Sequence, residues 1–229
     1  MTAEPFRIDV PQAVLDDLER RLELTRWPGE VEGAGLDYGT NLMYLKELVG
    51  YWGREYDWRK HEADLNTFRH FRAVVDGFGL HFIHERGKGP NPLPLLLTHG
   101  WPDSFWRFHK VIPMLTDPER FGGDAEDAFD VVVPSLPEYG FSERPTTRGM
   151  NAQAVADLFA QLMTRTLGYK AFAAHGGDLG RGVTEQLARR HADALVAIHL
   201  TDLPFRYLQC LPQDTLSDAE QRYLEAVQA

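Results

Sequence analysis

Residues 173–180 read Ala-Ala-His-Gly-Gly-Asp-Leu-Gly, and this stretch decides the fold. A short apolar run breaks at two glycines and then leads into a helical pattern. A nucleophile elbow has the same layout, because its sharp strand-to-helix turn lifts one side chain above a sheet. The raised residue here is Asp178, whose carboxylate is ionised at pH 7 without a base and is suited to attack on a saturated carbon. Taken alone, the octapeptide is more typical of a glycine-rich turn with an N-cap aspartate, so the rest of the chain must decide.

Predicted strands and helices alternate on both sides of this turn. Such alternation indicates βαβ units, and therefore an α/β fold with a largely parallel sheet. Before the first strand, the apolar spacing instead predicts three amphipathic helices, over 11–25, 41–56 and 58–68. The predicted strands are 72–75, 80–84, 93–98, 131–136, 171–174 and 195–200, and the later helices are 105–112, 151–167 and 179–191.

The composition of the chain limits which binding partners, cofactors and cellular locations we expect. The net charge of −10 argues against nucleic acid or an anionic membrane surface as a partner. The chain has no run of 18 apolar residues, so we expect no membrane span. Cys210 is the only cysteine, which excludes an internal disulfide and favours a reducing, cytoplasmic location. The histidines lack metal-ligand spacing with an acidic partner, and we expect neither a metal nor another cofactor.

Two loops follow predicted strands and should meet Asp178 at one rim, because ligands bind beyond the carboxyl ends of parallel strands. One loop is His-Gly-Trp-Pro at 99–102, and the other is 134–142, Pro-Ser-Leu-Pro-Glu-Tyr-Gly-Phe-Ser. An elbow enzyme needs two backbone N–H donors, one from the residue after the nucleophile and one from the loop after the third strand. Leu179 and Trp101 occupy those positions.

Taken in order, the motifs HGWP, SLPEYGFS and GGDLG resemble those of microsomal-type epoxide hydrolases, a family of α/β hydrolases. The resemblance implies an amino-terminal helical segment (1–69) that wraps the hydrolase core, the core itself (70–204) and the start of a lid (205–229). It also implies a small apolar epoxide and water as substrates. Asp178 would form the covalent ester, and Trp101 and Leu179 would form the oxyanion hole.

The resemblance also assigns a loop-shaping role to His99, Gly100 and Pro102, and implies that the Trp101–Pro102 peptide is cis. Each histidine considered as the water-activating base, namely His99, His175 and His191, is better read as structural or exposed. Geometry must come before pKa in choosing a base, and none of the three has the position that the resemblance would require.

The chain departs from the family in three ways. Leu179 stands where Trp is common, and Glu138 stands where the family has Gly. The family's relay acid, catalytic histidine and lid tyrosines would lie beyond Ala229, so we expect this chain to be an amino-terminal portion. Residues 205–229 would then enter the lid, with Ser217 as the N-cap of a helix that runs to Val227.

Two other functions remain open. Haloalkane dehalogenases also place Asp at the elbow, although the long amino-terminal segment and the aliphatic Leu179 argue against that reading. The second is a natural truncation that serves as a binding or assembly module without turnover.

Overall fold

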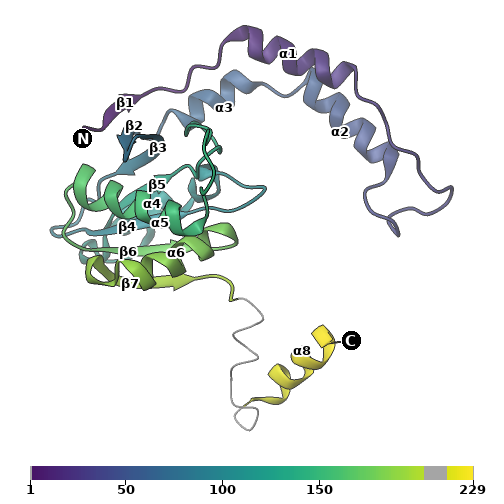
Figure 1. The fold of residues 1–229 in the computed structure, drawn as a ribbon. Coiled ribbons are helices and arrows are strands. Elements are labelled where there is room, and N and C mark those ends of the chain that lie inside the picture. Colours follow the sequence, from purple (N-terminus) through teal and green to yellow (C-terminus); the bar gives the residue numbers. More distant parts are fainter. Residues whose placement is uncertain (1, 204–215, 229) are drawn as a thin grey trace. The chain divides into compact units, whose positions relative to one another are not determined.

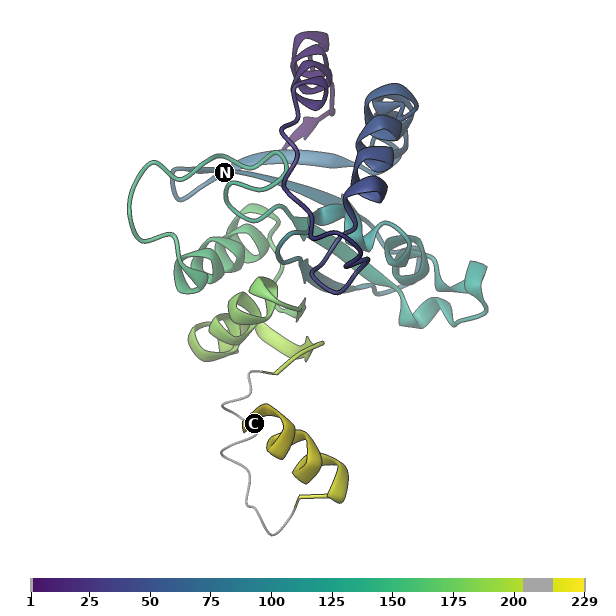
Figure 2. The same cartoon turned by 90° about the vertical axis from the view of Figure 1, so that its right-hand side faces the viewer.

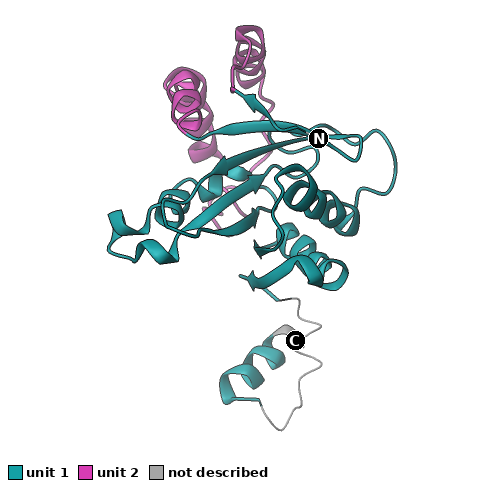
Figure 3. Cartoon of the chain, turned by 90° about the vertical axis from the view of Figure 1, so that its left-hand side faces the viewer, with its two compact units in different colours: residues 1–6, 68–229 teal, residues 7–67 magenta. Residues whose placement is uncertain are grey.

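The computed structural model describes residues 2–203 and 216–228 (Figure 1). The chain divides into two compact units (Figure 3). The first unit, which we call the sheet unit, comprises residues 1–6 and 68–229, and the second, the helical unit, comprises residues 7–67. The division assigns the first six residues to the sheet unit, whereas the sequence suggested a single helical segment over 1–69. Whether the helical unit wraps a hydrolase core stays a prediction.

The sheet unit is built on a seven-stranded sheet with the order β1-β2-β3-β5-β4-β6-β7. β4, β5, β6 and β7 run parallel, and the three strands at the other edge pair antiparallel. The carboxyl ends of the parallel strands therefore lie along one rim, as the sequence predicted. The strands are β1 (Glu4–Phe6), β2 (His70–Val75), β3 (Phe78–Glu85), β4 (Leu93–Thr98), β5 (Phe129–Pro134), β6 (Phe172–Gly176) and β7 (Leu195–Leu200).

Helices cover both faces of this sheet (Figure 2). The helices α5 (Ala152–Gln161) and α6 (Leu179–Arg190) pack on one face, and α4 (Val111–Thr116) packs on the other. The core beneath α5 and α6 is mainly apolar, and its largest members, Phe82, Phe159 and Phe172, are wholly buried. Strands buried on both faces read as continuous apolar runs, which is why the sequence predicted β4 and β5 so directly.

The short segments differ more from expectation. The helix predicted over 105–112 is divided into a 3-10 turn (η1, Phe105–Phe108) and α4. The helix predicted over 151–167 ends in a π-helical turn (η4, Leu162–Thr166). The other 3-10 turns in the described part of the sheet unit are η2 (Pro118–Phe121), η3 (Ala125–Asp127) and η5 (Ala192–Ala194).

One helix follows the residues that are not described. α8 covers Asp218–Gln228, and Ser217 caps it as expected. The Ser217 N–H donates to Glu220 Oε2 at 2.7 Å, and the Ser217 hydroxyl accepts from the Glu220 N–H at 3.4 Å, which is a capping box. About half of the predicted start of the lid, residues 205–215 and 229, lies outside the described residues.

The helical unit contains α1 (Gln12–Glu23), α2 (Leu42–Arg54) and α3 (Trp58–Leu65). Its polar anchor is Glu62, which accepts from the Val10 N–H at 2.7 Å, from Trp58 Nε1 at 3.0 Å and from Arg59 Nη1 at 2.7 Å. The bond from Val10 ties α3 to the segment before α1, and the other two fix the Glu62 side chain within α3. By contrast, neither α1 nor α2 contains a buried residue. None of the helices in the described ranges is long and apolar enough to cross a bilayer.

Candidate active site

Asp178 lies at the turn between β6 and α6, as the sequence predicted. Its backbone has φ 54° and ψ −123°, a conformation that a non-glycine residue rarely adopts. Two glycines permit the turn. A Cβ at Gly176 would collide with the carbonyl of Gly180, and a Cβ at Gly180 would collide with the carbonyl of Thr98. The side chain of Asp178 consequently stands exposed at the rim of the sheet.

Two backbone donors converge on the Asp178 carboxylate. The Trp101 N–H donates to Oδ1 at 2.8 Å, and the Leu179 N–H also donates to the carboxylate. Gly100 lies so close that a Cβ on it would overlap the carboxylate, so the loop after β4 can approach only with glycine at this position. The Trp101–Pro102 peptide is cis, which confirms the expectation from the HGWP motif.

These donors set the charge state of Asp178. Hydrogen bonds from the Trp101 and Leu179 N–H groups hold the pKa of its carboxyl below the usual value, and the positive charges of Arg107 and Arg181 lower it further. Partial burial acts in the opposite direction but is outweighed. Carboxylates that accept several backbone N–H bonds are held in the ionised form. Asp178 is therefore a carboxylate at neutral pH, with two donors already aimed at it.

His99 holds the loop that carries Trp101. Its Nε2 accepts from the Leu136 N–H at 3.1 Å, which leaves Nδ1 as the protonated nitrogen that donates to the Gly100 carbonyl at 3.0 Å. The ring is completely buried, and burial lowers its pKa. His99 is thus a neutral link between the loop after β4 and the loop after β5, consistent with the loop-shaping role predicted for it.

The other two histidines contact groups away from the carboxylate. The His175 ring, on β6, stacks on the ring of His199, with the two Nδ1 atoms 2.8 Å apart. His191, after α6, pairs with Asp157 at 2.7 Å. Among the described residues, no histidine hydrogen-bonds Asp178.

A cavity of about 360 Å³ opens beside the carboxylate, lined by Gly100, Trp101, Pro102, Asp103, Arg107 and Asp178. Sequence reasoning missed two of these residues. Arg107 Nε bonds Asp103 Oδ2 at 2.8 Å, so the pocket contains an ion pair as well as the carboxylate. Their spacing of four positions, immediately after the HGWP motif, is the signal that could have identified them.

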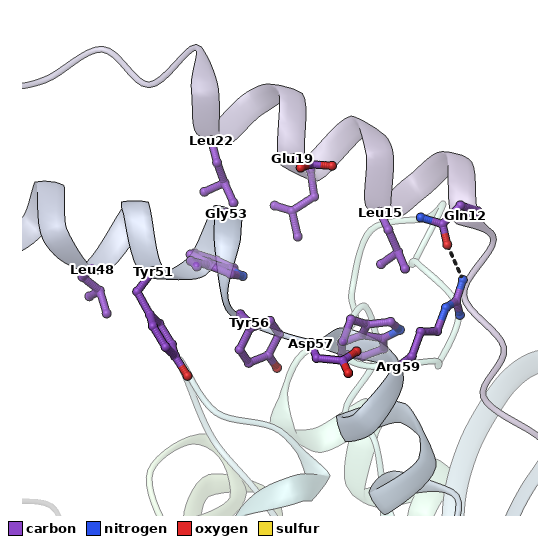
Figure 4. A pocket seen from close by; sticks show the side chains of 13 residues that line it. Gln12, Leu15, Glu19, Leu22, Leu48, Tyr51, Gly53, Tyr56, Asp57 and Arg59 are labelled. Carbon is purple, nitrogen blue, oxygen red and sulfur yellow. Dashed lines mark hydrogen bonds between the residues drawn. The ribbon is translucent and has the colours of Figure 1, made fainter.

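A larger cavity of about 710 Å³ lies within the helical unit (Figure 4). Leucines of α1, with Trp52, Tyr51 and Tyr56 of α2 and the turn after it, form most of its wall. Its polar contact is structural, because Arg59 Nη2 donates to Gln12 Oε1 at 3.1 Å. A site for chemistry is recognised by convergent polar groups rather than by volume. We therefore place the candidate active site at Asp178.

Comparison with known proteins agrees with this geometry. The family model described as "Epoxide hydrolase N terminus" matches residues 3–108, and the model described as "alpha/beta hydrolase fold" matches residues 94–228. The second match alone covers more than half of the chain. The chain belongs to the epoxide hydrolase family of α/β hydrolases.

Individual relatives support the assignment. A Stigmatella aurantiaca protein provisionally named an epoxide hydrolase is 50% identical over 225 residues, which cover 98% of this chain and 51% of that protein. Epoxide hydrolase 1 of Oryctolagus cuniculus is 38% identical over 86% of this chain and 44% of its own. The chain spans about half the length of the curated relatives that it matches.

Solved structures give the same result. The crystal structure of juvenile hormone epoxide hydrolase from Bombyx mori is similar with a TM-score of 0.79 and 32% identity, over 93% of this chain and 58% of that one. The Aspergillus niger epoxide hydrolase gives a TM-score of 0.83 and 29% identity, over 97% of this chain and 58% of that one.

Proposed function

We propose that this chain carries the nucleophilic half of an epoxide hydrolase, with Asp178 as the nucleophile. The observation that carries the proposal is the pair of N–H donors, from Trp101 and Leu179, on an exposed and ionised carboxylate at a strand-to-helix turn. Relatives named as epoxide hydrolases support this reaction over dehalogenation and over a role without turnover. The substrates are then a small apolar epoxide and water, and the proposal includes a cytoplasmic location.

In the first step, an oxygen of the Asp178 carboxylate attacks an epoxide carbon. The ring C–O bond breaks, and its electron pair goes to the ring oxygen, which takes a proton from solvent or from an acid group. The product is a hydroxyalkyl ester on Asp178. Covalent catalysis of this kind divides one difficult hydrolysis into two easier steps. The two donors orient the carboxylate for attack, because the bonds to Trp101 and Leu179 fix its position.

In the second step, water attacks the carbonyl carbon of the ester. Negative charge develops on an oxygen of Asp178 itself, where the Trp101 and Leu179 N–H groups already point, so the same donors serve as the oxyanion hole. Collapse of the intermediate releases a vicinal diol and restores the carboxylate. This step requires a base to activate the water, and the proposal assigns that role to none of the described histidines.

The test is the covalent intermediate. After mixing with styrene oxide, the protein should gain the mass of one styrene oxide molecule, and peptide mapping should place the adduct on Asp178. The Asp178→Asn variant should gain no adduct, because an amide is a poor nucleophile. Asp193→Asn is a matched control, since Asp193 is an exposed aspartate in η5. An adduct on Asp178→Asn at the parent rate would disprove the assignment.

A further inference from the structure

A second aspartate contacts the elbow from the neighbouring strand. Asp202 follows β7, and its Oδ1 accepts a hydrogen bond from the backbone N–H of Asp178 at 2.8 Å. Its other oxygen, Oδ2, accepts from Arg181 Nε at 2.9 Å. The two oxygens of one carboxylate therefore bond the raised residue itself and a residue in the first turn of the following helix.

The turn that carries Asp202 contacts the elbow at further points. The Thr201 N–H donates to the carbonyl of Gly176 at 3.3 Å. A Cβ at Gly177 would overlap the Thr201 hydroxyl oxygen, so the Thr201 side chain lies directly against the backbone of Gly177. The segment after β7 thus packs along the elbow just before the nucleophile.

Arg181 extends the contact along α6. Its backbone N–H donates to the Asp178 carbonyl at 3.1 Å, and its Nη1 donates to Glu185 Oε1 at 2.5 Å. The Arg181 side chain is four-fifths buried, and desolvation of its guanidinium is outweighed by the two carboxylates that raise its pKa. A guanidinium fixed by two carboxylates is a rigid support, because its planar donors match carboxylate geometry.

The backbone of Asp178 needs such a support. A non-glycine residue with φ 54° and ψ −123° is in a costly conformation, which persists only where neighbouring groups over-determine it. Asp202 provides an acceptor for the Asp178 N–H in that conformation. The side chain of Asp178 can then point toward the N–H groups of Trp101 and Leu179.

We propose that Asp202 is a positioning residue that holds the nucleophile elbow in its reactive conformation, with Arg181 fixing the Asp202 carboxylate in turn. The inference rests on the proposed function of Asp178 and adds a residue to it. Sequence reasoning did not find Asp202, because 24 positions separate it from Asp178. Its position at the carboxyl end of a predicted parallel strand was the available signal.

The test measures the rate at which styrene oxide labels Asp178, as a function of styrene oxide concentration. The Asp202→Ala variant should lower the limiting rate by about tenfold or more, the effect of losing a charged hydrogen-bond partner. The half-saturating concentration should change little, since Asp202 is not among the residues that line the cavity. Asp202→Asn should recover part of the rate, because its amide oxygen can still accept from the Asp178 N–H, although its amide nitrogen cannot accept from Arg181 Nε. Asp193→Asn should match the parent.

A second measurement tests the contact in the parent protein first. Hydrogen exchange of the Asp178 amide, followed by NMR, should be slow in the parent, and faster in Asp202→Ala if that variant folds. A fast, unprotected Asp178 amide in the parent would overturn the proposal. Labelling of a folded Asp202→Ala at the parent rate would also overturn it. If the parent is never labelled, the proposed function fails, while amide exchange still tests the contact with Asp202.

Discussion

The sheet unit buries the apolar side chains of its helices, whereas the helical unit leaves those of α1 and α2 partly exposed. In the sheet unit, α5 and α6 bury one face against the sheet, and residues such as Phe159 and Leu187 are wholly inaccessible. In the helical unit, α1 and α2 have clear apolar faces but no buried residue, and Trp52 is 45% exposed. Tertiary packing supplies most helical stability, so the sheet unit contains its own stabilisation and the helical unit contains little.

This difference bears on catalysis. The elbow must hold a strained residue, and strain persists only in a surrounding structure that is firmly packed. Asp178 accordingly lies between a buried strand and a helix whose inner face, including Val183 and Leu187, is buried. The helical unit has the larger cavity but no comparable support for reacting groups. Firm packing, rather than cavity size, distinguishes the candidate active site.

The largest expected effect comes from comparing truncations in the two units. Phe159→Ala should reduce the free energy of unfolding by about 3–5 kcal/mol, because it removes a wholly buried ring from the core. Trp52→Ala should cost less than about 1 kcal/mol, although it removes a larger side chain, because that ring is nearly half exposed. Urea unfolding of both variants makes the measurement. Equal losses would remove the distinction between the units.

The next largest effect is expected from acid pH, which should lower the free energy of unfolding of the sheet unit. Burial, with the nearby charges of His70 and Arg72, lowers the pKa of His81 to about 2, and burial and Arg86 lower that of His84 to about 4. Both rings stay neutral in the folded protein as pH falls below 6.5, while the unfolded chain takes up protons there. Proton uptake by the unfolded state costs stability, by about 1.4 kcal/mol per pH unit for each ring.

The loss from His84 should begin near pH 6.5 and end at about pH 4, where His84 itself becomes protonated in the folded protein, whereas the loss from His81 should continue below pH 4. Urea unfolding at a series of pH values, followed by an intrinsic signal of the sheet unit, makes the measurement. His84→Gln should flatten the slope between pH 6.5 and 4. An unchanged slope in that variant would show that the ring does not titrate as its burial requires.

The smallest expected effect is a gain in stability, from a substitution at the rim of the sheet unit. Glu138 has φ 74°, a conformation that costs a non-glycine residue about 1 kcal/mol or more. Its ion pair with Arg144 at 3.1 Å is exposed on both sides and is worth little. Glu138→Gly should therefore raise the stability by up to about 1 kcal/mol. A lower melting temperature in this variant would mean that the Glu138 side chain contributes more than its strain costs.

The sequence predicted most strands of the sheet unit and the motifs at its rim, but it did not predict the side-chain contacts between them. Its strands are continuous apolar runs, and the motifs around Trp101 and Asp178 follow them directly, so the rim could be assembled from chain order alone. β1 escaped notice, because three residues give no period to detect. The Arg107–Asp103 pair and Asp202 were also missed, since they depend on side-chain directions and on contacts distant in sequence.

One residue of the acidic surface departs from expectation for the same reason. The acidic stretches 117–119 and 124–127 read as a solvated loop, and four of their five carboxylates are exposed, but Asp117 is buried and its Oδ2 accepts from Lys88 Nζ at 2.6 Å. The partner is 29 positions away, and neither its identity nor its direction can be taken from a local charge pattern. Local composition predicts exposure only where no distant group supplies a counter-charge.

The most direct test of the central claim is a single turnover of styrene oxide in water enriched in heavy oxygen, carried out with the full-length protein. If Asp178 is the nucleophile, the diol from the first turnover takes its new oxygen from the Asp178 carboxylate. The heavy isotope should then appear in the peptide that contains Asp178, and the first diol formed should lack it. Heavy oxygen in the first diol, with an unlabelled Asp178 peptide, would mean that water attacks the epoxide directly and would contradict the account.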